Sequence, residues 1–84
     1  MIKIIKATKV EDHKIALQFS DTKEAVADLS YLLDFGTSLT EPLKDQTFFD
    51  QFFIDAGALC WKHGLELSAS SLYMKFVQTD SNAA

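Results

Sequence analysis

The sequence predicts an α+β fold in a single small domain, and three observations support this prediction. Residues 14–19 alternate between apolar and polar side chains, which is typical of an antiparallel strand with one buried face. The connections between the first three apolar segments are too short for a parallel crossover. Near the end of the chain, Leu72, Phe76 and Val77 recur at helical spacing together with Tyr73. Because a one-sided sheet and a one-sided helix bury each other's apolar faces, we expect this C-terminal helix to pack on the sheet.

The N-terminal third is predicted to form a three-stranded antiparallel meander. Residues 2–10 mix isoleucine with lysine, as in a strand with one wet face, and "EDH" follows as a polar turn. In the second strand, Lys14–Phe19, the apolar positions are Ile15, Leu17 and Phe19. "SDTK" then indicates another tight turn before a third strand over residues 24–29.

The middle of the chain is predicted to hold two short helices. "SYLLDFG" begins with Ser30 as a helix cap and ends at Gly36, which indicates one short helical turn. "TSLTEPLKD" is interpreted as a polar connection. Asp45 then caps a second short helix over residues 46–51.

A second hairpin and a final helix are predicted after residue 51. Asp55, Ala56 and Gly57 form a turn between two apolar segments, and His63 with Gly64 forms the next turn. Ser68 caps the last helix, and we expect the Trp61 indole to anchor the hairpin against that helix. The predicted domain covers residues 1–78, and residues 79–84 are predicted to be a disordered tail.

Composition and charge restrict the classes of partner. The chain has 84 residues, with eight lysines, no arginine, twelve carboxylates and a formal charge of −4. Nucleic-acid binding needs a clustered basic surface, so we expect no direct contact with DNA or RNA. No apolar run is long enough to span a membrane. The single cysteine allows no internal disulfide, which favours a reducing cytoplasm. An acidic domain attracts basic protein surfaces instead.

No catalytic, cofactor-binding or metal-binding residue is predicted. Cys60 and His63 suggest a nucleophile and its base, but no third group is placed to orient the imidazole, so a structural thiol is favoured. The only further histidine is His13, which leaves three Cys and His side chains for a zinc site that prefers four. Only a carboxylate or a second subunit would complete such a site.

Other conspicuous residues also fit structural roles. The glycines of the two turns, Gly57 and Gly64, permit positive φ and belong to no phosphate-binding loop. Core packing is favoured over base stacking for the phenylalanines Phe48, Phe49, Phe52 and Phe53. The paired acids lie at turns and caps, namely Glu11 with Asp12 and Asp45 with Asp50. The serine cluster, Ser68, Ser70 and Ser71, is typical of a helix start, and acceptance of a phosphate is left open as an alternative.

Three stretches, "VADLSYLL", "EPLKDQTFFDQFFID" and "LCWKHGLELSASSLY", resemble the small bacterial family called domain of unknown function 2442. The resemblance covers about residues 3–73 in one consistent order. At His63 the family usually has asparagine, and Glu66 stands at an acidic position after it. The resemblance implies an accessory protein, regarded as the antitoxin of a toxin–antitoxin pair, and transfers no catalytic site. Some relatives carry a helix-turn-helix domain, which we do not expect in this chain.

The sequence therefore favours a non-enzymatic protein-binding domain whose partner is a basic, toxin-like neighbour. The alternatives are a regulatory domain, related to transcriptional regulators, that senses a small ligand or contacts DNA, and a hydrolase that uses Cys60. The predicted contact surfaces are the N-terminal strand, at residues 3–9, and the exposed side of the C-terminal helix. A homodimer is left open.

Overall fold

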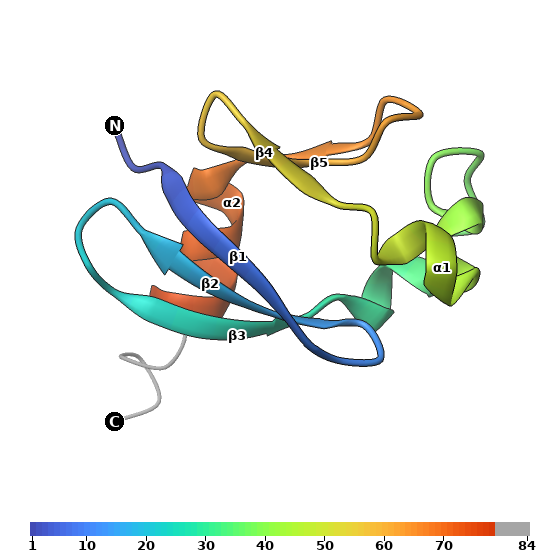
Figure 1. Cartoon of the computed structure of the whole chain (residues 1–84), viewed down its shortest axis with the longest axis horizontal. Coiled ribbons are helices and arrows are strands. Elements are labelled where there is room, and N and C mark those ends of the chain that lie inside the picture. The colour runs from blue at the N-terminus through green and yellow to red at the C-terminus, as the bar shows by residue number, and fades with distance from the viewer. Residues whose placement is uncertain (79–84) are drawn as a thin grey trace.

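A computed structural model describes residues 1–78, and the tail predicted for residues 79–84 lies outside the described residues. The first sheet contains β1 (Ile4–Glu11), β2 (Lys14–Phe19) and β3 (Glu24–Asp28), all antiparallel and in the order β1-β2-β3 (Figure 1). The predicted meander is confirmed, and the second strand has the predicted bounds. Its apolar side chains, Ile15, Leu17 and Phe19, are buried on the inner face of the sheet.

β1 is irregular at two points. Its register with β2 shifts between Ile4 and Lys6 and again between Lys9 and Glu11, so that Ile5 and Val10 are extra residues. Both extra side chains are exposed. Such bulges bend an edge strand and interrupt its pairing. Ile4 is nevertheless buried, at 2% exposure. Because of the bulge at Ile5, the inward-facing residues of β1 do not follow a simple alternation.

Three short helices connect the two sheets. η1 (Leu29–Asp34) and η2 (Glu41–Lys44) are 3₁₀ helices, and α1 (Gln46–Phe49) is a single α-helical turn. The predicted Ser30 cap is wrong, because the Asp28 side chain accepts a bond from the Ser30 backbone N–H and caps η1 two residues earlier. η2 lies within residues 37–45, for which the sequence predicts only a polar connection. The Asp45 cap of α1 is confirmed, since its carboxylate accepts from the Thr47 N–H.

The second hairpin is confirmed and extended by a third strand. β4 (Phe53–Asp55), β5 (Ala58–Cys60) and β6 (Glu66–Leu67) form an antiparallel sheet in the order β4-β5-β6. In the β4–β5 turn, Ala56 and Gly57 have φ of 51° and 81°, which suits the right-handed twist of a hairpin. The Gly57 carbonyl accepts a 2.9 Å bond from the Ile4 N–H and so joins the two sheets.

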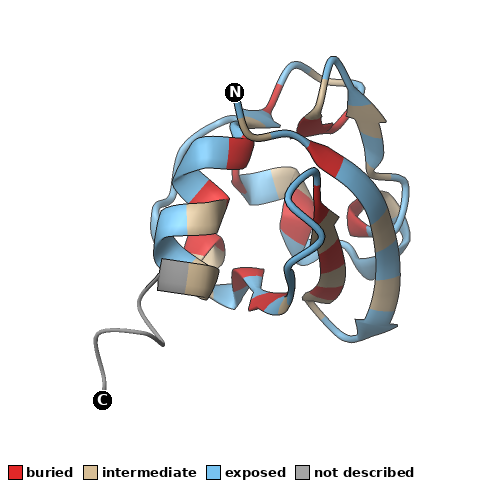
Figure 2. Ribbon diagram, turned by 90° about the vertical axis from the view of Figure 1, so that its left-hand side faces the viewer, coloured by how far each residue is buried: buried red, intermediate tan, exposed pale blue. Residues whose placement is uncertain are grey.

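The C-terminal helix packs on the inner face of the first sheet, as predicted. α2 (Ala69–Tyr73) continues into a π-helical turn, η3 (Met74–Gln78), which contacts β3. Ser68 caps α2 by accepting from the Ser71 N–H at 3.2 Å. Figure 2 shows the helix on one side of the sheet, with buried residues on the facing surfaces. The other face of the first sheet has no element of residues 1–78 packed over it.

Trp61 lies in the centre of the core and is 2% exposed. Its indole N–H donates to the Phe49 carbonyl at 2.9 Å, and its ring contacts Phe49 and Phe52. These contacts join the second sheet to α1, whereas the sequence suggested the last helix as the partner of the indole. No helix within residues 1–78 is long and apolar enough to cross a membrane.

Candidate functional site

Cys60 and His63 do not form an activated nucleophile. The thiol is buried and lies 3.7 Å from the Ala58 carbonyl. Burial raises the pKa of Cys60, and the Glu66 carboxylate adds to this effect, so less of the reactive thiolate is present. The His63 Nε2 lies 2.7 Å from the Leu39 carbonyl and donates to it, while the buried Nδ1 has no hydrogen-bond partner within residues 1–78, the Cys60 thiol included. Cys60 therefore has the environment of a structural thiol.

The two histidines instead hold the segment that contains η2. His13 Nε2 lies 2.7 Å from the Leu43 carbonyl, and His63 Nε2 makes the same contact with the carbonyl of Leu39. Each imidazole also packs against a phenylalanine ring, His13 on Phe49 and His63 on Phe48. Within residues 1–78, no three His, Cys, Asp or Glu side chains come together to hold a metal ion.

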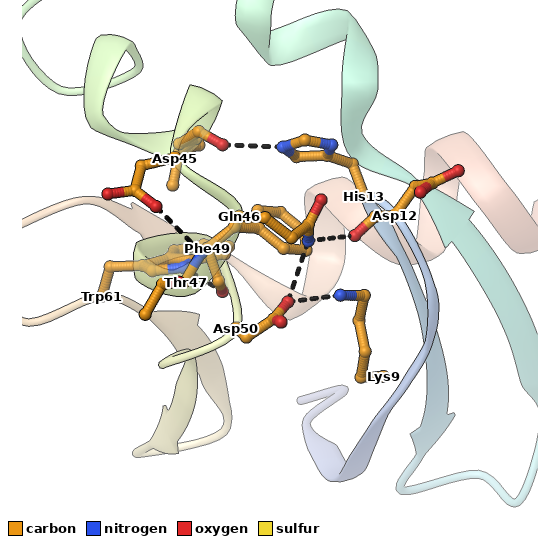
Figure 3. Close-up of polar contacts among 10 residues, drawn as sticks. Lys9, Asp12, His13, Asp45, Gln46, Thr47, Phe49, Asp50 and Trp61 are labelled. Carbon is orange, nitrogen blue, oxygen red and sulfur yellow. Dashed lines mark hydrogen bonds and ion pairs between the residues drawn. The ribbon is translucent and has the colours of Figure 1, made fainter.

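A polar network links the β1–β2 turn to α1 (Figure 3). The Gln46 amide donates to the Asp12 carbonyl at 2.6 Å and to the Asp50 carboxylate at 2.9 Å. Lys9 forms an ion pair with the same carboxylate. The bonds from Lys9 and then Gln46 lower the pKa of Asp50. The acids Asp45 and Asp50 thus have structural roles, one as a cap and one as an ion-pair partner.

The phenylalanines do not form a flat stacking surface. Phe49 is fully buried, Phe48 and Phe52 are half-buried, and Phe53 is exposed. The serine cluster is a cap, since the Ser68 hydroxyl bonds the Ser71 hydroxyl as well as its N–H. Phe49 and the serine cluster have the structural roles that the sequence predicts, whereas the core position predicted for Phe53 is wrong, because its side chain is 44% exposed.

The surface of residues 1–78 includes two hollows that could hold a small molecule. The first, of about 210 Å³, is on the outer face of the first sheet and is lined by Lys6, Thr8, Ala16, Leu17, Gln18 and Glu24. The second, of about 550 Å³, lies between the N-terminal segment, the β4–β5 turn and the start of α2, and it is lined by Met1, Ile2, Ala56, Gly57, Ala58, Glu66, Ser68, Ala69 and Ser70. Both are open to solvent.

The outer edge of β3 is the most regular unpaired backbone of the first sheet. The β2–β3 register runs without a shift from Lys14↔Asp28 to Gln18↔Glu24. Bonds of 2.8 Å flank this ladder, from the Phe19 N–H to the Lys23 carbonyl and from the Leu29 N–H to the His13 carbonyl. Bonded pairs alternate along an antiparallel ladder, so the odd-numbered residues of β3 bond to β2. The N–H and C=O groups of Glu24, Val26 and Asp28 therefore point away from it.

β3 has no strand on that side within residues 1–78. The side chains of Glu24, Val26 and Asp28 are exposed on the outer face, and Val26 is 54% exposed. A hydrogen bond from the Ser30 N–H lowers the pKa of Asp28. The edge thus combines free backbone groups, one aliphatic side chain and two negative charges.

β1, which the sequence suggested as a contact surface, is a less suitable edge. The Ile4 N–H is already bonded to Gly57, and the extra residues Ile5 and Val10 break the regular spacing. The Lys9 side chain is held by Asp50. The opposite charges of the two edges, lysines on β1 and carboxylates on β3, were readable from the sequence, but the bulges were not.

The sequence matches a family model described as protein of unknown function (DUF2442) over residues 4–78. Comparison with curated proteins and with solved structures found no match. The matched segment includes both sheets and the C-terminal helix, and it extends past the resemblance that the sequence motifs indicated. Because the match covers most of the chain, the chain belongs to the DUF2442 family.

Proposed function

We propose that this domain is a non-enzymatic accessory protein that binds a basic partner protein, as the antitoxin-like member of a pair would. The observation that carries the proposal is the unpaired, acidic edge of β3. Exposed backbone groups give a protein partner hydrogen bonds, and carboxylates favour a positively charged one. The formal charge of −4 acts in the same direction over longer distances.

The absence of a catalytic arrangement around Cys60 and His63 supports a binding role over an enzymatic one. The thiol is buried with a raised pKa, and the His63 Nε2 is bonded to a backbone carbonyl. A nucleophile needs a lowered pKa or an adjacent base. The pKa of this cysteine is raised, and the hydrogen bond described for its thiol goes to the Ala58 carbonyl and not to an imidazole.

The test is the interaction with the product of the neighbouring gene. The two proteins are co-expressed, and association and dissociation rates are measured between about 0.05 and 0.5 M salt. Salt screens electrostatic steering, so association should slow markedly with salt while dissociation changes less. Failure to bind, or an association rate that is independent of salt, contradicts the proposal.

A ligand-sensing role is the second candidate, because the hollow of about 550 Å³ falls within the usual size range of small-molecule sites. A screen of metabolites by thermal shift distinguishes the two functions. Stabilisation by a metabolite, lost when the exposed Ser70 at the rim is replaced by Phe to fill the hollow, favours sensing. Stabilisation only by the neighbouring protein favours the accessory role.

A further inference from the structure

We propose that β3 binds a basic, extended segment of the partner as an added β-strand, which becomes the fourth strand of the first sheet. This inference rests on the proposed function and specifies the contact through which it is carried out. The backbone groups of Glu24, Val26 and Asp28 already have the spacing and direction that a new strand needs. Figure 1 shows β3 along the lower border of the sheet, on the side opposite β1.

The side chains of β3 define which segment fits. Residues of an added strand lie beside those of β3 at alternate positions on the same face, where opposite charges attract and like charges repel. Lysine or arginine therefore suits the positions beside Glu24 and Asp28, and an aliphatic residue suits the position beside Val26. The resulting pattern, basic-x-aliphatic-x-basic, is the same in both directions along the chain.

The inner side of the added strand favours small or apolar residues. Ala25 and Ala27 of β3 lie on the inner face of the sheet. η3 contacts this strand, and its half-buried side chains Phe76 and Val77 pack against the core. Apolar residues at the x positions would extend that surface. The expected partner segment is thus a positively charged strand with one apolar face.

A second copy of this chain is a poor occupant. Pairing two β3 strands antiparallel about Val26 places Glu24 of each copy beside Asp28 of the other, which brings like charges together. Pairing β3 with β1 of another copy requires an edge that is interrupted at Ile5 and Val10 and partly bonded to Gly57. The charges and the bulges both disfavour self-association through the first sheet.

The probe is a capped synthetic peptide with lysine, valine and lysine at alternate positions, separated by valine, which gives the inner side its apolar face. Its affinity is measured by fluorescence anisotropy against a matched peptide that carries glutamate in place of lysine. We expect the lysine peptide to bind about tenfold more tightly, since two favourable charge pairs replace two repulsive ones. Equal affinity for the two peptides overturns the proposed charge recognition.

Charge variants of the domain locate the contact. Glu24→Lys should weaken binding of the lysine peptide about tenfold, and Asp28→Asn about threefold. The asparagine can still cap η1, because its side-chain oxygen also accepts a hydrogen bond. Glu66→Lys, on β6 of the second sheet, changes the net charge by the same amount as Glu24→Lys and serves as the matched control. An equal loss of affinity in Glu24→Lys and Glu66→Lys means that only net charge matters, which overturns the β3 site.

Val26→Pro tests strand addition directly. The Val26 N–H points away from β2, so proline removes a donor for the added strand without removing a ladder bond inside the domain. Binding should fall at least about tenfold in Val26→Pro and persist in Val26→Thr, which keeps the N–H. Thermal melting of both variants checks that they fold. Unchanged binding by a folded Val26→Pro overturns the proposal.

Amide hydrogen exchange gives a second measurement on the wild-type domain. In the complex, exchange should slow at the amides of Glu24, Val26 and Asp28, and change little at Ala25 and Ala27, which are already bonded to β2. Protection at other strands overturns the site. If the same amides are protected without peptide and analytical ultracentrifugation shows a dimer, the edge is occupied by a second copy of the chain. That result overturns the proposal that β3 binds a basic partner strand.

The natural partner separates failure of this site from failure of the proposed function. If the neighbouring protein binds wild type and folded Val26→Pro equally, the accessory function stands and strand addition at β3 is overturned. If it fails to bind wild type while the lysine peptide protects the β3 amides, the basic-strand site stands and that pairing is wrong.

Discussion

Trp61 illustrates how one residue can join two parts of a small core. Its indole is almost fully buried, so it contributes a large apolar area to the core. The N–H donates to the Phe49 carbonyl, and this bond fixes the orientation of the ring. The hydrogen bond places α1 beside the second sheet. The concentration of rare residue types around position 61 reflects packing, because Cys60 is also buried and the His63 Nε2 is bonded to a carbonyl.

Replacement of Trp61 by alanine should therefore be among the most costly single changes. We expect the free energy of unfolding to fall by about 3–5 kcal/mol, from lost burial and the remaining cavity. Trp61→Phe keeps much of the ring but removes the donor to Phe49, and should cost about 1–3 kcal/mol. Urea denaturation followed by circular dichroism measures both. A loss below about 1 kcal/mol for Trp61→Ala contradicts the role assigned to the indole.

At the scale of elements, the β4–β5 turn sets the contact between the two sheets. Gly57 has a φ of 81°, and a Cβ added there would lie 2.8 Å from the Cβ and Cγ of Lys3. The same residue accepts the bond from Ile4. The turn thus needs glycine for its backbone conformation and for the close approach of the N-terminal segment.

The pair Gly57→Ala and Gly36→Ala separates these two requirements. Gly36 also has a positive φ, of 68°, but no described heavy atom outside its neighbours lies within 4 Å of an added Cβ. Gly36→Ala should cost about 1 kcal/mol from backbone strain alone, and Gly57→Ala about 2–3 kcal/mol. Urea denaturation measures both variants. An equal loss of unfolding free energy in the two variants would show that the Lys3 side chain moves away from the added Cβ without destabilising the domain.

For the whole molecule, the pKa shifts predict how stability depends on pH. The Tyr73 hydroxyl lowers the pKa of Asp21, the Ser30 N–H that of Asp28, and Lys9 that of Asp50. A lowered pKa means that the unfolded chain takes up protons first, so stability is present above the ordinary pKa of 3.8 and is lost as pH falls through the lower folded values. Acid should therefore destabilise the domain.

Alkali should act through different groups. Burial raises the pKa of Cys60 and that of Tyr31 above their ordinary values of 9.0 and 10.0. The unfolded chain then loses protons first, and stability falls as pH rises through those values. Urea denaturation across pH should give a plateau between about pH 5 and 8, with losses on both sides.

The variant Asp50→Asn tests the acid limb of this profile. It should reduce stability at neutral pH by about 0.2–1 kcal/mol, as expected for an exposed ion pair, and should weaken the dependence on acid. An unchanged acid limb would assign the effect to the remaining carboxylates.

The sequence by itself determined the elements whose signals are local. The alternation of Lys14–Phe19, the caps at Asp45 and Ser68 and the turn at Gly57 each depend on sterics and hydrogen bonds within a few residues. Such patterns survive any tertiary arrangement that buries the apolar face. They were enough to predict the meander, the second hairpin and the C-terminal helix on the sheet.

Only the tertiary structure decided which groups meet across the chain. His13 and His63 bond to carbonyls 30 and 24 residues away, and Trp61 bonds to one 12 residues away. The open edge of the first sheet is likewise a matter of packing, because Ile4 bonds to Gly57 and the bulges interrupt β1, while β3 remains regular. Every residue except proline carries the same backbone donor and acceptor, so no local pattern shows which of these groups will stay unpaired.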